Sequence, residues 1–447
     1  MLIPTQDPIA YLFSLEQFGI KLGLTTIRHL VTALGSPDRT FHTILVAGTN
    51  GKGSVAAMVE HGLRASGLRV GLFTSPHLVD INERFMLNGK CVDTTTLTAG
   101  AQRIRETVET SVRNGDLKYH PTFFEATTAL AFLLFEQASI DVAVVEVGMG
   151  GRFDATNMVT PIGIAIPSID IDHQQFLGDT LAQIAFEKAG VIKPNSLVVT
   201  AEDKQQPLEV LRSTAAKQNA RLVQANMDVE IVSHTNDGIT FIEQIVTPHR
   251  CYGPLRLSLR GHHQINNAVV AIRLLEELSV SKLEIPTKAI IDAITDVRWP
   301  GRLELVNVSP KRKVLLDPAH NVAAAAKLGA YINQWRPQGL PFVFSALRDK
   351  DIPGILRALD KAITHIVCTT IDNPRAPSLN ELTRTVSKIK PDIPLDAIEN
   401  PTKALDLCWD KGPLAVVTGS VFLVGAVRKN LGLGDQNSDT TFARMYN

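Results

Sequence analysis

The chain of 447 residues has few cysteines and no excess of charge of either sign. Lysine plus arginine and aspartate plus glutamate both number 45, so no net charge attracts nucleic acid or an anionic membrane. The four cysteines stand far apart without a Cys-x-x-Cys pair, which argues against a zinc site and against a disulfide framework. These cysteines are Cys91, Cys251, Cys368 and Cys408. Any partner must therefore be inferred from local sites.

Long apolar stretches are absent as well. No run reaches the ~18 apolar residues of a membrane-spanning helix. The first residues, 1–8, lack a basic segment followed by an apolar one. We therefore expect a cytoplasmic protein with neither a membrane nor a nucleic acid as partner. Because the chain is longer than one hydrophobic core usually supports, we also expect two domains.

The most informative stretch that is present is glycine-rich. A short apolar run, 44–47, leads into Gly48-Thr49-Asn50-Gly51-Lys52-Gly53-Ser54, and apolar residues at helical spacing follow. In such a strand–loop–helix unit the glycines let the backbone approach an anion, the amides point at it, the lysine adds charge and the hydroxyl can bind Mg²⁺. The motif predicts a phosphate site. Its spacing departs from the common pattern because Gly53 separates Lys52 from Ser54, and a glycine-rich turn without a ligand is the alternative.

Polar residues also follow three other predicted strands. Ser75 follows the strand 69–73, Glu146 lies near the end of the apolar run 141–147, and His173 follows the strand 161–166. Open α/β sheets bind ligands at the carboxyl ends of their strands. A carboxylate in a strand covered on both faces must be paired, protonated or bound to a metal, since burying the charge without a partner has a high cost in free energy. A plain Ser-Pro turn and a structural histidine are the simpler interpretations of Ser75 and His173.

One lysine lies on the apolar face of a predicted helix, 180–190. Leu181, Ile184, Ala185 and Lys188 occupy positions i, i+3, i+4 and i+7 of that helix. Lys188 either extends its amine to solvent near the helix end or has a chemical role. A neutral lysine reacts with CO₂ to give a carbamate, which replaces a cation by a carboxylate-like ligand.

Several motifs together resemble the Mur ligase superfamily and, within it, the bifunctional dihydrofolate synthase/folylpolyglutamate synthase family. The likeness rests on the glycine-rich loop and on segments 74–78, 82–85, 146–157, 187–190, 261–268, 299–304 and 317–321. It implies an α/β fold with a P-loop-type, mostly parallel sheet domain followed by a smaller Rossmann-like α/β domain. We place the ATP- and folate-binding domain at 1–298 and the glutamate-binding domain at 299–447. The family has Thr-Asn-Ile where this chain has Pro167-Ser168-Ile169, which leaves open how the usual hydrogen bonds are replaced.

The resemblance also implies an activity, an ATP-dependent amide ligase of folate biosynthesis. ATP would phosphorylate a carboxylate of dihydropteroate or of a folate, and the amine of L-glutamate would attack the acyl phosphate. The implied cofactors are ATP and two Mg²⁺ ions, with a carbamate on Lys188. The implied metal ligands are Ser54, Ser75, Glu146, His173 and Lys188. The implied catalytic residues are Lys52, Lys188, His173 and Arg302. The implied ATP-binding residues are those of the loop 48–54 together with Gln264, Asn267, Arg302 and Asp317. The implied substrate-binding residues are Phe124, Arg84, Asp154, His320 and Ser420. Phe124 and Asp154 match pterin-contacting positions, although Phe124 is most simply a core residue.

Three alternatives stay open. The enzyme could be a monofunctional folylpolyglutamate synthase, or a Mur ligase of peptidoglycan synthesis, against which the Lys-Gly-Ser loop and the segments around Ser75 and Asp154 weigh. A non-catalytic ATP-binding switch is the third, and Glu146, His173 and Lys188 weigh against it. No Ser-His-Asp triad competes with these interpretations. The expected partners are small molecules, namely dihydropteroate, folates and L-glutamate, and we expect a monomer.

Overall fold

The computed structural model describes residues 6–21 and 23–433, which form two compact units, neither of which is one continuous stretch of chain. The first unit contains the described residues up to Ser75 together with Ile81–Asp228 and Asn267–Ala293. The second contains Pro76–Asp80, Val229–Asn266 and the described residues from Ile294 onward. Of the helices in these ranges, none is long and apolar enough to cross a membrane.

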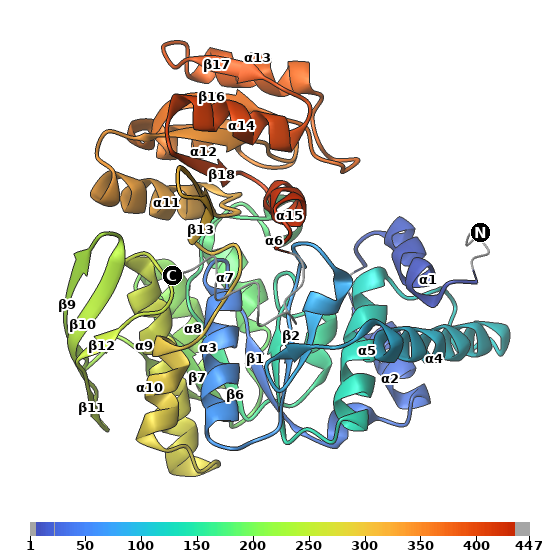
Figure 1. Cartoon of the computed structure of the whole chain (residues 1–447). Coiled ribbons are helices and arrows are strands. Elements are labelled where there is room, and N and C mark those ends of the chain that lie inside the picture. The colour runs from blue at the N-terminus through green and yellow to red at the C-terminus, as the bar shows by residue number, and fades with distance from the viewer. Residues whose placement is uncertain (1–5, 22, 434–447) are drawn as a thin grey trace. The chain divides into compact units, whose positions relative to one another are not determined.

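The first unit is built on a sheet whose strands β1, β2, β6 and β7 are labelled in Figure 1. The sheet has eight strands in the order β4-β3-β2-β5-β1-β6-β7-β8. The strands are β1 (His42–Val46), β2 (Val70–Phe73), β3 (Phe85–Leu87), β4 (Lys90–Cys91), β5 (Val142–Glu146), β6 (Gly163–Ile166), β7 (Leu197–Thr200) and β8 (Arg221–Gln224). All pairs are parallel except those made by β3 and β4. Val46 of β1 lies opposite Glu146 of β5 on one side, and β6 pairs on the other. The loops that follow β1, β5 and β6 therefore leave the sheet side by side.

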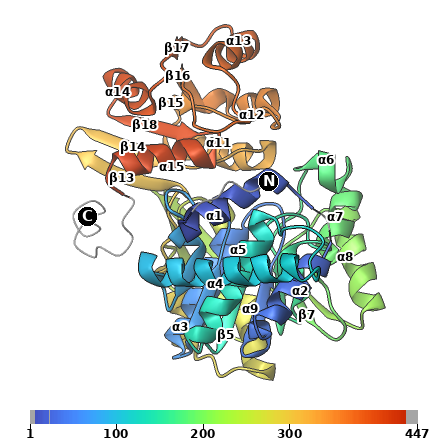
Figure 2. The ribbon, with the colours of Figure 1, turned by 90° about the vertical axis from the view of Figure 1, so that its right-hand side faces the viewer.

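Helices cover both faces of this sheet, which explains why its central strands are continuous apolar runs. The main hydrophobic core lies on the face covered by α1 (Pro8–Ser14), α2 (Thr25–Ala33), α4 (Thr94–Arg113), α5 (Phe123–Gln137), α7 (Leu181–Ala189) and α8 (Gln205–Lys217). Figure 2 shows α4 and α5 lying side by side. The other face carries α3 (Lys52–Ala65), α9 (His263–Ser281) and α10 (Thr287–Thr295). There α3 approaches α9 so closely that a Cβ on Gly62 would lie 2.7 Å from Leu275 Cδ1.

The local elements confirm the α/β class and several boundaries expected from the sequence. The predicted buried helix is α5, which begins after a capping box made by Thr122 and Glu125. The predicted helix 180–190 is α7, capped in the same way by Thr180 and Gln183. The short helices η1 (Leu15–Phe18), η2 (Pro37–Arg39), η3 (Ile81–Arg84), η4 (Ala155–Met158) and α6 (Gln174–Leu177) complete the unit.

Residues 229–266, which the sequence prediction placed in the first domain, cluster with the second unit. They include a small antiparallel sheet of β9 (Glu230–Asn236), β10 (Ile239–Val246), β11 (Cys251–Tyr252) and β12 (Leu255–Arg256) (Figure 1). The turn between β9 and β10 contacts α11: Trp335 Nε1 donates to Asp237 Oδ1 at 2.7 Å, and Tyr331 Oη donates to Gly238 O at 3.3 Å. The domain boundary at 298/299 stays a prediction.

The second unit also holds a six-stranded sheet with the order β13-β14-β18-β15-β16-β17. Its strands are β13 (Glu304–Ser309), β14 (Arg312–Leu316), β15 (Leu340–Phe344), β16 (Ile363–Cys368), β17 (Leu395–Ala397) and β18 (Leu414–Thr418), and only β13 is antiparallel to its neighbour. One core lies against α11 (Val322–Trp335), α12 (Ile352–Ala358) and α13 (Leu379–Ile389), with η5 (Asp360–Ala362) beside them. The other lies against α14 (Pro401–Lys411) and α15 (Val421–Asn430). The predicted Rossmann-like arrangement is confirmed.

Candidate active site

The loop after β1 has the backbone of an anion cradle. Gly48 and Gly51 have φ of 124° and 86°, values that residues with a side chain rarely adopt. Helix α3 begins at Lys52, so the amides of its first turn point back toward the loop. Ser54 lies in that first turn with only 2% of its surface exposed. The geometry fits a bound phosphate, with a hydroxyl placed beside it.

Two lysines meet at one carbonyl of this loop. Lys52 Nζ donates to Gly48 O and to Thr49 O, both at 3.2 Å. Lys188 Nζ, from α7, donates to Gly48 O at 2.9 Å. Burial, and then the positive charge of Lys52, lower the pKa of Lys188 to about 7, while nearby aspartates act in the opposite direction. Near neutral pH a large fraction of Lys188 is therefore the neutral amine.

Glu146 ends β5 as a buried carboxylate with neighbours that compensate its charge. Its Oε2 accepts a hydrogen bond from Ser75 N at 3.2 Å, so the ends of β5 and β2 are joined there. The guanidinium of Arg84 lies 5.0 Å from the centre of the Phe123 ring. Burial lowers the pKa of Arg84 to about 10, and carboxylates that include Glu146 act in the opposite direction. The amide of Ser75 and the nearby positive charge of Arg84 thus offset part of the cost of burying this carboxylate.

Phe124 and Asp154 border the glycine-rich loop after β5. Phe124 is half-buried, and a Cβ on Gly148 would lie 2.6 Å from its Cζ. Asp154 Oδ2 accepts from Met149 N at 2.9 Å, and its Oδ1 accepts from Thr156 N at 3.0 Å and from Thr156 Oγ1 at 2.5 Å. Burial raises the pKa of Asp154, against the effect of these hydrogen bonds. Both oxygens of Asp154 therefore hold the loop together.

The same loop fixes the end of α7. Arg152 N donates to Glu187 O at 2.9 Å, and a Cβ on Gly151 would lie 2.8 Å from Lys188 O. The guanidinium of Arg152 lies 4.1 Å from the centre of the Phe186 ring. The position of Lys188 is thus coupled to the loop that carries Asp154.

The segment that follows β6 lies at the same edge of the sheet as the loop after β1. Ser168 O accepts from Thr49 N at 2.7 Å, and Ser168 Oγ donates to Asn50 O at 3.2 Å, so Pro167-Ser168-Ile169 still contacts the cradle. His173 N donates to Asp172 Oδ1 at 2.8 Å. His173 has φ 51° and ψ 38°, a left-handed conformation that costs a residue with a side chain about 1–3 kcal/mol. Such strain is typical of functional positions.

The first turns of α9 carry the two predicted amides. Asn267 is buried, and its Oδ1 lies so near Gly51 that a Cβ at that glycine would overlap it. Gln264, one turn earlier, is 1% exposed. Asn267 therefore lies beside the cradle in the first unit. Position 51 requires glycine because a side chain there would overlap Asn267.

The remaining predicted residues lie in the second unit. Asp317 follows β14 and accepts from Leu303 N and Ala319 N, both at 3.0 Å. Burial raises the pKa of Asp317 to about 6, against the attraction of Arg302. His320 Nδ1 lies 2.9 Å from Pro318 O. Ser420 is buried and caps α15, accepting from Phe422 N at 3.2 Å. Its hydroxyl is therefore engaged in capping this helix.

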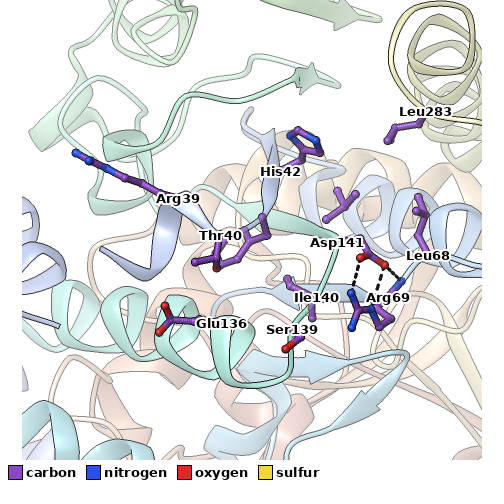
Figure 3. Close-up of a pocket in the computed structure, with 12 residues that line it drawn as sticks. Arg39, Thr40, His42, Leu68, Arg69, Glu136, Ser139, Ile140, Asp141 and Leu283 are labelled. Carbon is purple, nitrogen blue, oxygen red and sulfur yellow. Dashed lines mark hydrogen bonds and ion pairs between the residues drawn. The ribbon is translucent and has the colours of Figure 1, made fainter. Parts of the chain in front are cut away.

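A separate pocket of about 700 Å³ lies at the opposite ends of the strands, next to the starts of β1, β2 and β5 (Figure 3). Arg69 and Asp141, which both line it, form an ion pair with 2.7 Å between Nη2 and Oδ1. Arg39 and His42 also line it, and every lining residue differs from those predicted for the site. Because open α/β sheets bind ligands at the carboxyl ends of their strands, the loop after β1 is the better candidate.

Sequence reasoning missed the contacts that support the cradle from the neighbouring strand ends. Asn50 Nδ2 donates to Asp170 Oδ2 at 3.1 Å, and Lys204 Nζ lies 3.2 Å from Asp170 Oδ1. Lys204 follows β7 and also contacts the buried Glu202. Asp170 could be seen in the sequence as one of the polar residues that follow the strand 161–166, but no role was assigned to it. No motif marks Glu202 or Lys204, for which the only available signal was that β7 is a further parallel strand ending at the same edge.

Comparison with known families and proteins agrees with this geometry. Residues 46–275 match the Mur ligase middle domain, and residues 301–421 match the family described as Mur ligase, glutamate ligase domain. The dihydrofolate synthase/folylpolyglutamate synthase of Bacillus subtilis (strain 168) is 34% identical over 435 residues, covering 95% of this chain and 99% of that protein.

Two solved structures are similar over nearly the whole chain. Mycobacterium tuberculosis folylpolyglutamate synthase complexed with ADP and AMPPCP has a TM-score of 0.88 and 33% identity, covering 96% of this chain and 100% of the other. The bifunctional folylpolyglutamate synthase/dihydrofolate synthase of Yersinia pestis, complexed with AMPPNP and a Mn ion, has a TM-score of 0.82 and 28% identity, with coverages of 96% and 100%.

Proposed function

The chain belongs to the Mur ligase family, in its dihydrofolate synthase/folylpolyglutamate synthase branch, and from this premise we propose that it joins L-glutamate to dihydropteroate and to folates at the expense of ATP. The observation that carries the proposal is the cradle after β1, where Lys52 and Lys188 meet at Gly48 O. A Mur ligase of peptidoglycan synthesis is disfavoured because the B. subtilis relative matches almost end to end.

The reaction proceeds in two transfers. A carboxylate oxygen of the acceptor attacks the γ-phosphorus of ATP, and ADP leaves as the acyl phosphate forms. The amine of glutamate then attacks the acyl carbon, phosphate leaves, and the amine loses a proton. Phosphoryl transfer depends on positioning and on charge neutralisation more than on a protein nucleophile. The loop amides supply the positioning, and Lys52 exchanges its two carbonyl partners for phosphate oxygens.

A divalent cation fits the donors that the structure places around this loop. When bound, it would neutralise phosphate charge and orient the transferred group. Ser54 offers a buried hydroxyl and Glu146 a buried carboxylate, with Ser75 and His173 at the neighbouring strand ends. Within residues 6–21 and 23–433 no three His, Cys, Asp or Glu side chains gather closely enough to hold a metal. The remaining ligands of two Mg²⁺ ions would therefore be hydroxyls, phosphate oxygens and a modified lysine.

Lys188 is our candidate for that modification. Its neutral amine would add to CO₂, forming the N–C bond of a carbamate and releasing one proton. Two features support this proposal. The amine is buried and its pKa is lowered to about 7, and the cation Lys52 has the largest effect on that pKa of the charged groups around it. Carbamate formation would turn a repulsive pair into an attractive one.

Other roles follow from the family and are likewise proposals. Arg84, Phe124 and Asp154 would bind the pterin end of the acceptor, and His320 and Ser420 would bind glutamate. Gln264, Asn267, Arg302 and Asp317 would contact the nucleotide. We further propose that residues 1–298 act as the ATP- and folate-binding domain and 299–447 as the glutamate-binding domain, in a cytoplasmic monomer.

The decisive experiment is glutamate-dependent release of ADP, with acceptors supplied one at a time. We expect turnover with dihydropteroate and with a reduced folate. Turnover with the folate alone would reduce the function to a monofunctional folylpolyglutamate synthase. ADP release that ignores glutamate and every folate acceptor would overturn the assignment.

A further inference from the structure

The segment that follows β6 is hydrogen-bonded to the phosphate loop (residues 48–54) through Asp170, which has no part in the proposed reaction. Thr49 Oγ1 donates to Asp170 O at 3.0 Å and accepts from Asp170 N at 2.9 Å. Asn50 Nδ2 donates to Asp170 Oδ2 at 3.1 Å. One aspartate therefore holds two consecutive residues of the loop, both of which precede the turn at Gly51.

Asp170 brings a negative charge to a loop built to receive a more negative ligand. Its negative charge also acts to raise the pKa of Lys188, whose amine donates to Gly48 O in the same loop. An unbalanced carboxylate there would repel phosphates, since like charges a few Å apart interact strongly at a partly buried site. The carboxylate therefore needs a counter-charge.

Lys204 supplies that counter-charge from the end of β7. Its Nζ lies 3.2 Å from Asp170 Oδ1, and it also donates to Ile169 O at 2.9 Å and to Glu202 Oε1 at 3.1 Å. Partial burial acts against the ammonium, but Asp170 and Glu202 outweigh it and raise the pKa of Lys204, so the side chain stays charged.

Glu202 anchors the lysine. It is 3% exposed and accepts from Ile169 N at 2.6 Å and from Lys204 N at 2.9 Å. The two carboxylates and the ammonium thus span the ends of β6 and β7, and Asp170 presents its other oxygen to Asn50. Neither spacing nor motif in the sequence brings these three residues together.

We propose that Asp170 is a positioning residue of the phosphate loop and that Lys204 neutralises it, so that Thr49 and Asn50 are held for a nucleotide without electrostatic repulsion. The ligand concerned is the phosphate chain of ATP or ADP, so the inference rests on the proposed function. Neither Asp170 nor Lys204 needs to touch the reacting atoms.

A double-mutant cycle tests this directly. Lys204→Met removes the counter-charge and leaves the carboxylate, Asp170→Asn removes the carboxylate, and the double variant removes both. We measure the dissociation constant of Mg²⁺·AMPPNP by calorimetry at low ionic strength, and the KM for ATP separately from kcat. Lys217→Met, at the exposed end of α8, serves as the matched control for loss of a lysine.

The expected pattern is non-additive. Lys204→Met weakens nucleotide binding by about tenfold and raises KM for ATP with little change in kcat, whereas Asp170→Asn weakens binding by less than about threefold. Adding Asp170→Asn to Lys204→Met restores affinity to within about threefold of Asp170→Asn alone. Lys204→Arg retains near-normal affinity, because it keeps the charge. Should Lys204→Met fold poorly, Lys204→Gln takes its place as the charge-removing variant of the cycle.

Two results would overturn the inference. In the first, Lys204→Met binds the nucleotide like Lys217→Met. In the second, the double variant binds as weakly as Lys204→Met or more weakly, which would show that the lysine acts through structure and not through the charge of Asp170. The binding of Mg²⁺·AMPPNP is measured without acceptor or glutamate, so a failure of the glutamate-ligase assay leaves this test readable and separates the two proposals.

Discussion

Replacing Lys188 by methionine should make the metal-free, CO₂-free protein more stable at neutral pH, although it should abolish activity. The amine is buried, and its pKa is lowered from 10.5 to about 7. At pH values between about 7 and 10.5, Lys188 is protonated in the unfolded chain but not in the folded protein. The stability of the wild type therefore rises with pH from about 7 to 10.5, and below pH 7 the folded state carries the full cost of the buried charge.

The size of the effect follows from the same pair of values. Lowering a pKa from 10.5 to about 7 corresponds to about 5 kcal/mol, at about 1.4 kcal/mol for each tenfold change in proton affinity. The variant also loses the hydrogen bond from Lys188 Nζ to Gly48 O, worth about 1 kcal/mol. We therefore expect Lys188→Met to be more stable than the wild type by about 3 kcal/mol at pH 7 and slightly less stable at pH 10.5.

Urea unfolding of both proteins at several pH values between 7 and 10.5, with a chelator and without bicarbonate, measures this difference. The difference between the two proteins cancels the titration of other groups. Bicarbonate should then stabilise the wild type and leave Lys188→Met unchanged, because a ligand that binds only the folded state raises its stability. If the difference in unfolding free energy stays constant across the pH range, the amine does not titrate near 7 and our reasoning on its reactivity fails.

Three further predictions concern the reaction. Lys52→Ala should lower kcat by at least about a hundredfold while leaving the melting temperature near that of the wild type, because its amine donates to carbonyls of the loop that we propose as the phosphate site. Near-normal turnover at saturating ATP would refute the assignment of the cradle. Labelled bicarbonate should give a carbamate signal on Lys188 in carbon-13 NMR, and short carboxylates should partly restore Lys188→Ala; a bare amine in an active, metal-loaded enzyme is the contrary result. Asp154→Ala should lower kcat/KM for dihydropteroate more than for a tetrahydrofolate, on the order of 1–3 kcal/mol for one buried hydrogen bond, in a protein first shown to use both acceptors. Equal losses with both acceptors, together with a lower melting temperature, would restrict Asp154 to holding its loop.

The parts of the fold that could be predicted are those with a signal in a short stretch of sequence. The strand, glycine-rich turn and helix around Gly48 have distinct periodicities, and the capping residues Thr122 and Thr180 fix where α5 and α7 begin. Lys188 could be found because one lysine on an apolar face breaks a regular pattern. The sequence prediction placed the small sheet at 230–256 in the first domain, whereas it clusters with the second unit. Nothing in the sequence indicates this, because β9 alternates between partly and fully exposed residues and the contact of the following turn with Trp335 joins segments far apart in the chain.

Asp170 and Asp154 show why the site was only partly predictable. Both are aspartates in loops after parallel strands, and the sequence marks both as polar residues at the ligand-binding edge. A carboxylate at such a place can bind a ligand, hold its own loop or orient a neighbouring one, and only its hydrogen-bond donors distinguish these roles. Asp154 accepts from Met149 and Thr156 within its own loop, whereas Asp170 accepts from Asn50 in another. The cation that pairs with Asp170 is Lys204, which comes from a third strand end, and no one-dimensional pattern contains that contact.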